Sequence, residues 1–464
     1  MPSRQDQLHS YQFMVQRVVA ALVMRETDPA QSPFRRAAGA TLASVLIAAI
    51  TLGAVGVYGL IVGGGGTSWR DSGAVIVEKE SGARYVYREE KLHLVLNYAS
   101  ALLIVGSPRP KTVLVSRKSI EGVPRGTTLG IADAPDSLPD ADGLATGPWT
   151  ICSLTLAEAG GSKPRSALLI GSSAPDGTPL GDAGVLARHP DGSLHLIWQN
   201  RRHLIRDRVL VLAALTWPSE PSFEVAPALL NALPAGADLA RIPMPGRGGE
   251  SVEVADAEIG EVFVVESQGG GRQYAVAKRD GLANITELQA NLLLTDLGQD
   301  DPTPLSQNRF ASIRKLPDLV PADPAAPPPT TPELVPAGDG GVCADVSDDA
   351  GVARVRTGVS MPDLTGTART AARSSRGAAL ADHVLVEPGG GVVVEAAAAP
   401  GATGGAVSVV TDLGRRHAVA NGEVLGMLGY GGVRPVRLPA SLVALVPAGE
   451  ALDPEAALAP AAPG

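Results

Sequence analysis

The dominant feature of the hydropathy pattern is one unbroken apolar run, residues 37–62, that contains no charged residue. As a helix it would span roughly 39 Å at 1.5 Å per residue, whereas the hydrocarbon core of a bilayer is about 30 Å thick. A cleaved signal peptide has a shorter apolar core and a small-residue cleavage site, and here four glycines, residues 63–66, follow the run instead. The pattern predicts a single transmembrane helix followed by a flexible exit linker.

Basic residues flank this run unequally. Five arginines precede it, and Arg70 is the only basic residue close behind it; the five are Arg4, Arg17, Arg25, Arg35 and Arg36. Positively charged flanks stay on the cytoplasmic side of a membrane. We therefore predict a single-pass protein of the cell (inner) membrane, with residues 1–36 in the cytoplasm and the C-terminal region periplasmic.

The cytoplasmic arm carries apolar residues at steps of three and four, which is typical of an amphipathic helix with Ser3 or Asp6 as its N-cap. The stripe consists of Leu8, Tyr11, Val15, Val18, Val19 and Leu22. It could lie on the inner leaflet or dock onto a cytoplasmic partner, and we predict Tyr11, Val15, Val18 and Leu22 as partner-binding residues. Within the membrane run, Ala49, Gly53 and Gly56 form a small-residue face for helix packing, although glycine is common in membrane helices anyway.

Beyond the anchor, four segments combine a glycine with a short alternating strand, namely residues 82–87, 192–197, 271–276 and 414–419. Alternation indicates half-buried strands. Helices are predicted after the first and third segments, at residues 96–105 and 287–294. A separate duplication relates Pro234-Ala235-Gly236 to Pro447-Ala448-Gly449. The spacing is too uneven for a tight solenoid, so we expect small α+β units around a central β-rich core.

The predicted fold class is α+β, with a cytoplasmic helical arm, one transmembrane helix and an elongated periplasmic region holding a β-rich core domain and about four small α+β repeat domains. A Pro-rich connector is predicted over residues 322–336, and the composition of residues 449–464 predicts a loose tail. The predicted boundaries are 1–36 for the arm, 37–62 for the membrane helix, 63–110 for the linker and first repeat, 111–190 for the first segment of the core domain, 191–268 and 269–320 for the second and third repeats, 321–410 for the connector and the second segment of the core domain, 411–452 for the fourth repeat, and 453–464 for a flexible tail.

Composition narrows the chemistry. The chain is 45% hydrophobic but only 3% aromatic, and its net charge of −9 argues against a nucleic-acid partner. Both cysteines, Cys152 and Cys343, follow the anchor. An even count in an oxidising compartment favours one disulfide, with two buried thiols as the alternative.

No motif assembles into an active site, so we predict no catalytic, cofactor-binding or metal-binding residue. The dipeptides Lys111-Thr112 and Lys118-Ser119 lack the preceding glycine that a phosphate-binding loop requires. The histidines are scattered without metal-ligand spacing. One basic cluster stands out, consisting of Arg201, Arg202, Arg206 and Arg208, which is either a solvated face or a surface for anionic wall polymer or an acidic partner.

Several sequence blocks together resemble one family, EccB, the single-pass core component of type VII (ESX) secretion systems. The most specific block runs over residues 116–139. The residues that carry the resemblance are Ser10-Tyr11-Gln12-Phe13, Arg35-Arg36, Val115-Ser116-Arg117-Lys118-Ser119-Ile120, Val123-Pro124-Arg125-Gly126, Leu129-Gly130-Ile131, Ala134-Pro135-Asp136-Ser137-Leu138-Pro139, Trp149-Thr150-Ile151-Cys152, Pro388-Gly389-Gly390-Gly391-Val392, Leu428-Gly429-Tyr430 and residues 438–449. The arm is somewhat short for the family, and the Ala/Gly-rich residues 366–406 differ in texture.

The resemblance implies a cytoplasmic arm, one membrane helix, and a periplasmic core domain with four repeats in which Cys152 pairs with Cys343. It implies assembly with the membrane ATPase EccC, with EccD, EccE and a membrane-bound subtilisin-like protease, with membrane lipid, and with itself as a periplasmic dimer within a larger oligomer. The family has also been described as an ATPase, so ATP is a possible cofactor, which the missing phosphate loop does not support.

We therefore predict a structural scaffold subunit of the secretion complex that acts by binding rather than catalysis. The alternatives are an ATP-hydrolysing component of that complex and a cell-wall-binding module that uses Tyr85, Tyr274 and the arginine cluster. The sequence does not identify the paralogous system, its substrates or the copy number.

Overall fold

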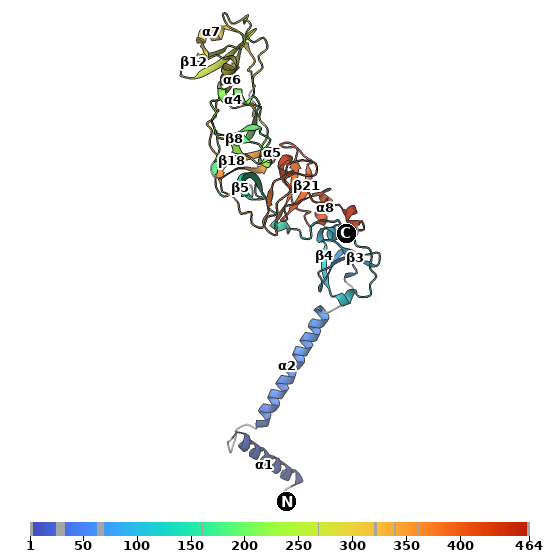
Figure 1. Cartoon of the computed structure of the whole chain (residues 1–464). Coiled ribbons are helices and arrows are strands. Elements are labelled where there is room, and N and C mark those ends of the chain that lie inside the picture. Colours follow the sequence, from blue (N-terminus) through green and yellow to red (C-terminus); the bar gives the residue numbers. More distant parts are fainter. Residues whose placement is uncertain are drawn as a thin grey trace. The chain divides into compact units, whose positions relative to one another are not determined.

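The computed structural model describes residues 3–24, 33–62, 69–158, 161–267, 269–319, 323–337, 340–360 and 362–461 (Figure 1). The chain divides into two compact units. The first contains Met1–Arg70 and Val115–Gly122, and the second contains Asp71–Leu114 and Val123–Gly464. The predicted glycine linker, residues 63–66, lies outside the described residues.

The first unit is mainly helical, with α1 (Arg4–Met24), α2 (Pro33–Val62) and a short 3-10 turn, η2 (Arg117–Ile120). Ser3 is the N-cap of α1, because its hydroxyl accepts a hydrogen bond from the Asp6 N–H at 3.3 Å. The Asp6 carboxylate accepts in return from the Ser3 N–H and hydroxyl, at 3.1 and 2.8 Å. These bonds lower the pKa of Asp6. Both predicted capping residues thus act together in one reciprocal cap.

The second unit contains five sheets. Sheet 1 has the order β3-β2-β1-β4, with β1 (Ala74–Glu78), β2 (Arg84–Arg88), β3 (Lys91–Val95) and β4 (Lys111–Val115). Sheet 2 has the order β10-β9-β8-β11, with β8 (Gly184–Arg188), β9 (Leu194–Trp198), β10 (Arg201–Ile205) and β11 (Phe223–Glu224). Sheet 3 has the order β15-β12-β13-β14-β16, with β12 (Val262–Glu266), β13 (Arg272–Lys278), β14 (Gly281–Ile285), β15 (Thr303–Pro304) and β16 (Lys315–Leu316).

Sheet 4 has the order β22-β21-β20-β23, with β20 (Gly391–Ala397), β21 (Ala406–Thr411), β22 (Arg416–Val419) and β23 (Val436–Pro439). The central sheet has the order β19-β6-β5-β17-β18-β7, with β5 (Trp149–Glu158), β6 (Gly161–Leu169), β7 (Thr178–Pro179), β17 (Gly341–Asp348), β18 (Gly351–Val359) and β19 (His383–Leu385). The helices are α3 (Tyr98–Val105), α4 (Arg208–Ala214), α5 (Pro227–Ala232), α6 (Glu287–Leu297), α7 (Gln307–Ser312), α8 (Gly422–Met427), α9 (Ala440–Val443) and α10 (Pro454–Leu458), with a second 3-10 turn, η3 (Ala141–Gly143). This mixed α+β architecture confirms the predicted class.

Sheets 1 to 4 share one local plan. Three consecutive antiparallel strands are followed by a helix, and the chain then returns beside the first strand. In sheets 2, 3 and 4 that returning strand is parallel to the first one, as β11 is to β8, β15 to β12 and β23 to β20. A later segment pairs in parallel with the outer strand of each meander, as at Val95 with Leu129 and Ile205 with Leu239. The plan therefore recurs in residues far apart in the chain.

The predicted helices at 96–105 and 287–294 are present as α3 and α6, because the sequence signals both ends. Asn97 caps α3 by accepting from the Ser100 N–H, and Gly106 ends it in the left-handed conformation at φ 64°. Thr286 and Gln289 form a capping box at the start of α6, and Gly298 ends it at φ 69°.

The four glycine-led segments are not equivalent, which corrects that aspect of the sequence interpretation. The first three contain the second strand of a meander, β2, β9 or β13, whereas residues 414–419 contain the third strand, β22. Sheet 4 accordingly begins with β20 at Gly391 rather than at residue 411. β20 lies inside its sheet with Val392, Val393 and Val394 all buried, so it shows none of the alternation that marks a half-buried strand.

The C-terminal residues do not form the expected loose tail as far as residue 461. Leu452 and Ala457 are fully buried, and α10 packs against α3. The chain then bonds to the segment beside sheet 1, where the Gly130 N–H donates to Ala459 O at 3.4 Å and the Ala461 N–H donates to Thr128 O at 2.8 Å. Burial of apolar side chains and long-range backbone bonds order a segment whose composition is typical of a linker.

The Pro-rich connector matches its prediction over residues 323–337, which contain no helix and only an isolated bridge at Leu334. It is nevertheless anchored. Its backbone carbonyls accept from Gly184 in sheet 2, at Glu333 O, and from Leu288 in α6, at Pro329 O. The connector thereby ties sheets 2 and 3 together.

Buried side chains form continuous cores between neighbouring sheets. One core joins Trp149 and Ile151 of the central sheet to Ile197 of sheet 2 and Val394 of sheet 4. A second joins sheet 1 to sheet 4 and includes Tyr430. The Tyr430 hydroxyl donates to Pro139 O at 2.7 Å, which satisfies a buried phenol.

Candidate interaction surfaces

The α1 helix presents a lengthwise apolar stripe. Tyr11, Val15, Val18 and Leu22, the predicted partner-binding residues, are 68%, 42%, 55% and 77% exposed. Leu8 continues the stripe, and Met14 flanks it at 63% exposure. Phe13, 62% exposed, lies on another face of the helix and stacks beneath the Arg17 guanidinium at 5.9 Å. Sequence periodicity found the stripe but missed Phe13, because this residue does not follow the three- and four-residue steps.

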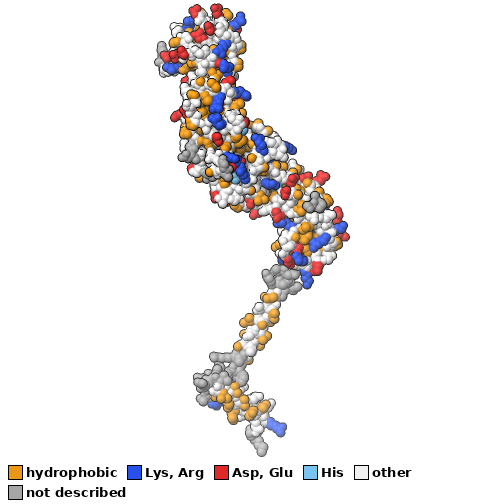
Figure 2. Space-filling model, viewed as in Figure 1, with side chains coloured by type: hydrophobic (Ala, Val, Ile, Leu, Met, Phe, Trp, Pro, Cys, Tyr) orange, Lys and Arg blue, Asp and Glu red, His pale blue; other side chains and the backbone are white. Residues whose placement is uncertain are grey.

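The α2 helix is apolar and open along its described length. Its window Ala38–Val55 has a mean hydropathy of 2.0, and none of it is buried within the structure. Figure 2 shows hydrophobic side chains along this helix with no Lys, Arg, Asp or Glu between its grey ends. The polar exceptions are Thr41, Ser44 and Thr51, and each hydroxyl donates to a backbone carbonyl one turn earlier, at 3.0, 2.8 and 2.7 Å. Such bonds hide hydroxyls from lipid, so α2 suits a membrane.

The predicted small-residue face of α2 has no contact within the described residues. Ala49 is exposed, and a Cβ placed on Gly53 would meet nothing within 4 Å. The surroundings of Gly56 lie outside what the structure describes. The helix starts at Pro33, earlier than the predicted residue 37, and so includes Arg35 and Arg36.

The disulfide between Cys152 and Cys343 is present, with Cα atoms 4.0 Å apart and a sequence separation of 191. The two residues face each other on the neighbouring strands β5 and β17 in the middle of the central sheet. Beside them, Asp345 is buried and accepts from Thr150 at 2.8 Å, Arg356 at 2.9 Å and Arg354 at 2.9 Å. These donors lower the pKa of Asp345 although burial opposes the shift. The disulfide and the Asp345 contacts thus join β5 and β17, two strands that are far apart in the sequence.

The arginine cluster is largely taken up by internal contacts. Arg202 Nε donates to Leu233 O at 3.3 Å, Arg201 donates to Ala235 O at 3.3 Å, and Arg206 pairs with Asp238. Sheet 4 repeats the first of these contacts, since Arg416 Nε donates to Val446 O at 3.0 Å. Burial lowers the pKa of both Arg202 and Arg416. Arg201 and Arg202 therefore help to hold the fold together, whereas Arg206 and Arg208 remain exposed at the surface.

A histidine follows each of these two arginines and locks the Pro-Ala-Gly segment. His203 Nδ1 lies 2.8 Å from Ala237 O, and His417 Nδ1 lies 3.0 Å from Glu450 O. A Cβ added to Gly236 or Gly449 would lie 2.2 or 2.3 Å from the histidine ring, so only glycine fits. The Pro-Ala-Gly duplication detected in the sequence is therefore a structural lock between the outer strand and the returning segment.

The tyrosines of the wall-binding hypothesis are also engaged within the fold. Tyr85 is half-buried, donates to Glu78 at 3.3 Å and lies under the Arg125 guanidinium at 4.7 Å. Tyr274 packs at the margin of a core of sheet 3. Tyr85 lies in β2 of sheet 1 and Tyr274 in β13 of sheet 3, whereas Arg201 and Arg202 lie in β10 of sheet 2, so the residues of this hypothesis belong to three different sheets.

The two lysine dipeptides are placed without a glycine-rich turn ahead of a helix. Lys111 starts strand β4, and Lys118 lies in the turn η2. Among the residues that the structure describes, no group of three His, Cys, Asp or Glu side chains could hold a metal ion.

These features define a class of protein in which one candidate membrane-spanning helix near the N-terminus is joined to a large assembly of small α+β sheets. Comparison with known proteins identifies the family within this class. A family model described as "Type VII secretion system ESX-1, transport TM domain B" matches residues 1–462. The chain belongs to this family, the EccB family of type VII secretion systems.

Among curated relatives, the protein named ESX-3 secretion system ATPase EccB3 of Mycolicibacterium smegmatis is 27% identical over 96% of this chain and 88% of its own length. The ESX-5 secretion system ATPase EccB5 of Mycobacterium tuberculosis is 29% identical over 72% of this chain and 67% of its own. A chain in the intact ESX-5 inner membrane complex matches with a TM-score of 0.68 at 25% identity, covering 100% of this chain and 96% of that one. The EccB3 dimer from the ESX-3 core complex matches with a TM-score of 0.65 at 28% identity, covering 83% and 100%.

Proposed function

We propose that this protein is a membrane-anchored scaffold subunit of a type VII secretion complex, and that it acts by binding other components rather than by catalysis. The observation that carries the proposal is the match of the whole chain to a subunit of the intact ESX-5 inner membrane complex. In this proposal α2 crosses the membrane once, α1 lies in the cytoplasm and the second unit lies in the periplasm. Sheets 1 to 4 serve as four repeat modules around the central sheet.

The partners in this proposal are those that the resemblance to the EccB family implies. They are the EccC-type ATPase, EccD, EccE, a membrane-bound subtilisin-like protease, membrane lipid, and further copies of this chain. Support for self-association comes from the solved EccB3 relative, which is a dimer. Support for cytoplasmic docking comes from the stripe of exposed apolar side chains on α1, which a lone helix in water would leave uncovered.

ATP hydrolysis is the second candidate, and it is favoured by the names of the curated relatives. The residues of this chain offer it little support, because Lys111 and Lys118 lie on a strand and a 3-10 turn rather than at a phosphate-binding helix start. The assay is turnover by the purified full chain in detergent. A rate that survives all purification steps and is abolished by one substitution that leaves the thermal unfolding curve unchanged would establish it.

The scaffold role is tested by purifying the tagged chain from actinobacterial membranes in mild detergent and identifying the proteins that accompany it. The proposal predicts a large particle that contains the EccC-type ATPase. Recovery of a lone monomer or dimer, under conditions in which the other components remain assembled with each other, would refute it.

A further inference from the structure

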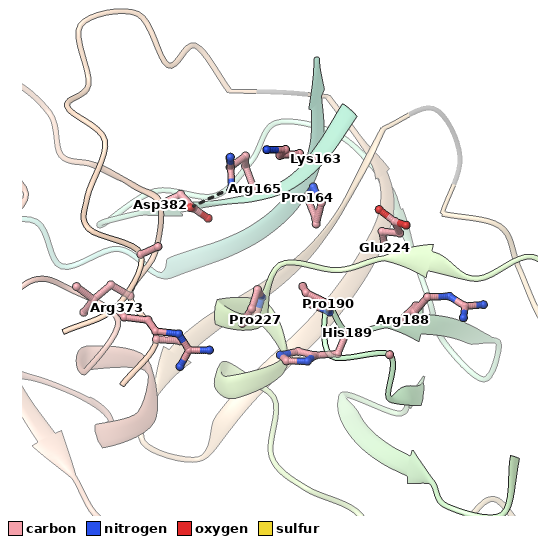
Figure 3. A pocket seen from close by; sticks show the side chains of 14 residues that line it. Lys163, Pro164, Arg165, Arg188, His189, Pro190, Glu224, Pro227, Arg373 and Asp382 are labelled. Atoms are coloured by element: carbon pink, nitrogen blue, oxygen red, sulfur yellow. Dashed lines mark ion pairs between the residues drawn. The ribbon is translucent and has the colours of Figure 1, made fainter. Parts of the chain in front are cut away.

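A pocket of about 510 Å³ lies in the second unit, between the central sheet and sheet 2. Its walls come from the edge of β6, from the end of β8, from β11 and from the loop before β19 (Figure 3). A volume of this size is typical of sites that hold a small molecule or a short peptide.

The charges around this pocket are unequal. Four cationic side chains, Lys163, Arg165, Arg188 and Arg373, line it together with two carboxylates, Glu224 and Asp382. The lining thus carries a formal charge of +2 (four minus two) in a chain whose net charge is −9. A positive pocket in an acidic protein favours an anionic ligand.

Two of these charges are already neutralised inside the fold. Arg165 donates to Glu158 twice, at 2.6 and 2.7 Å. Asp382 is buried, accepts from the Ser166 N–H and hydroxyl at 2.9 and 2.7 Å, and lies 3.8 Å from Arg165. They form a fixed wall of the pocket and leave the other four charges to face a ligand.

None of the other three cations forms an ion pair with a carboxylate among the residues that the structure describes, although Lys163 interacts electrostatically with Glu158 and Arg188 is the strand neighbour of Glu224. Arg188 donates only to the neutral Ser222 hydroxyl, at 3.1 and 2.9 Å. Arg373 donates to the carbonyl of Gly377 at 3.0 Å, and Lys163 is exposed. Uncompensated guanidinium groups bind carboxylate and phosphate oxygens with charge-assisted hydrogen bonds.

The loop that carries Arg373 is held in an unusual conformation. Ala372 has a φ of 57°, in the left-handed region that residues with a Cβ seldom adopt. The strain is maintained by a small hairpin, in which Arg373 pairs with Ala379 and the Leu380 N–H donates to Ala372 O at 2.9 Å. Strained backbone of this kind clusters at ligand-binding positions.

The prolines and the free carboxylate of the pocket lining favour a carboxylate ligand over a phosphate ligand. Three prolines, Pro164, Pro190 and Pro227, lie between the charged groups and offer apolar surface to methylene groups (Figure 3). Glu224 lies across the pocket from Arg165, where it would repel a multiply charged anion but could accept a peptide N–H. We propose that this pocket binds a short acidic peptide segment, with Arg373 receiving the carboxylate, Lys163 adding positive charge at the far wall of the pocket, and Glu224 accepting from the peptide backbone.

The test is calorimetric titration of the full-length chain in detergent with acetyl-Ala-Glu-Ala-amide, compared with acetyl-Ala-Gln-Ala-amide and with inorganic phosphate. Binding of the Glu peptide alone, weakened by raising the salt concentration, is the expected result. We expect Arg373→Ala to weaken that binding about five- to tenfold, because it removes a charge-assisted hydrogen bond that is partly screened by solvent. Lys163→Ala should weaken it less, because it removes only a more distant positive charge.

Arg376→Ala is the matched control, since Arg376 is an exposed residue of the same loop that does not line the pocket. It should bind the Glu peptide as the unmodified chain does. Three results would each overturn the proposal: equal binding of the Gln peptide, binding of phosphate but not of the Glu peptide, or equal losses in Arg373→Ala and Arg376→Ala. The assay does not depend on the scaffold role, so either inference can fail without the other.

Discussion

The two helices of the first unit and the sheets of the second obtain their stability from different sources. Along α1 and the described length of α2 most large apolar side chains are exposed, whereas Val19 is half-buried and Ala20 is buried. In the second unit most valines and leucines of the five sheets are buried, with Leu94 and Leu114 of sheet 1 as exceptions, and the Arg202 side chain donates to a backbone carbonyl. The helices therefore expose apolar surface to lipid or to partner proteins, whereas the second unit buries its own hydrophobic cores. Substitutions in the second unit should change its unfolding, and substitutions in the helices should change association.

Removal of the disulfide should produce the largest change in stability. Replacing Cys152 and Cys343 together by alanine opens a link across a sequence separation of 191. For loops of this length the loss is about 2–5 kcal/mol of unfolding free energy. Thermal unfolding of the variant beside the unmodified chain, both without reductant, measures it. Superimposable unfolding curves would show that the link does not stabilise this unit.

The glycine–histidine lock in sheet 2 should give the next largest effect. In Gly236→Ala the new Cβ would lie 2.2 Å from the His203 ring, and relief of the overlap costs about 1–3 kcal/mol. Adding His203→Ala removes the obstructing ring, so the double variant should lose less stability than the sum of the two single variants. Strictly additive losses would mean that the ring and the glycine do not interact.

Sheet 3 provides a natural contrast to this lock. Its corresponding strand pairing places Ala283 opposite Leu316, where sheet 2 has histidine and glycine. In sheet 2 the large residue of the pair, His203, lies on the meander strand, whereas in sheet 3 the large residue, Leu316, lies on the returning segment. Leu316→Gly should therefore destabilise sheet 3 by loss of side-chain packing, by about 1–3 kcal/mol for a half-buried leucine, whereas glycine is required at position 236. A Leu316→Gly variant as stable as the unmodified chain, in denaturant unfolding, would contradict the comparison.

Acid should weaken the second unit through its buried histidines. Burial lowers the pKa of His195 to about 4, and it also lowers the pKa of His203 and His417. The unfolded chain then binds more protons than the folded one below about pH 6.5, so the unfolding free energy falls as the pH drops from 6.5 towards 4. Urea midpoints measured between pH 7.5 and 4.5 would test this, and His195→Gln should reduce the slope. An unchanged slope in that variant would exclude His195 as a contributor.

The smallest effect on unfolding is expected in α2. A side chain added at Gly53 would meet no neighbour within 4 Å of its Cβ, so Gly53→Leu should leave the unfolding of the second unit unchanged while reducing close helix packing. Unfolding midpoints together with the yield of the assembled complex measure the two effects separately. A shifted midpoint would show that α2 contributes to the fold of the second unit.

Local signals allowed the sequence to predict four helices, α1, α2, α3 and α6, but not the shorter helices α4, α5 and α7 to α10. The apolar run, the Ser3–Asp6 cap of α1 and the Thr286 capping box each lie within a few residues of the element they define. Strand β20 was not predicted, because both of its faces are buried and its sequence shows no alternation. Helix α10 was not predicted, because the contacts that order it come from residues near 130. The disulfide was predicted from cysteine count, compartment and family resemblance.

The peptide pocket could not be predicted in this way. Its lining residues span positions 163 to 382, and the left-handed Ala372 that places Arg373 has no sequence signature. The arginine cluster shows the opposite limitation. Its charges were visible in the sequence, but their use as donors to backbone carbonyls depends on how the returning segment pairs with β10.

The exposed stripe of α1 is expected to hold this chain within a secretion complex, while the second unit is expected to fold without it. The most direct test is the mass of the detergent-solubilised particle that carries Val15→Asp, compared with Gln16→Asp, which puts the same charge on a neighbouring exposed position outside the stripe. The account predicts that Val15→Asp is recovered as a much smaller particle with an unchanged unfolding midpoint, and that Gln16→Asp retains the full assembly. Particles of equal mass in the two variants would contradict it.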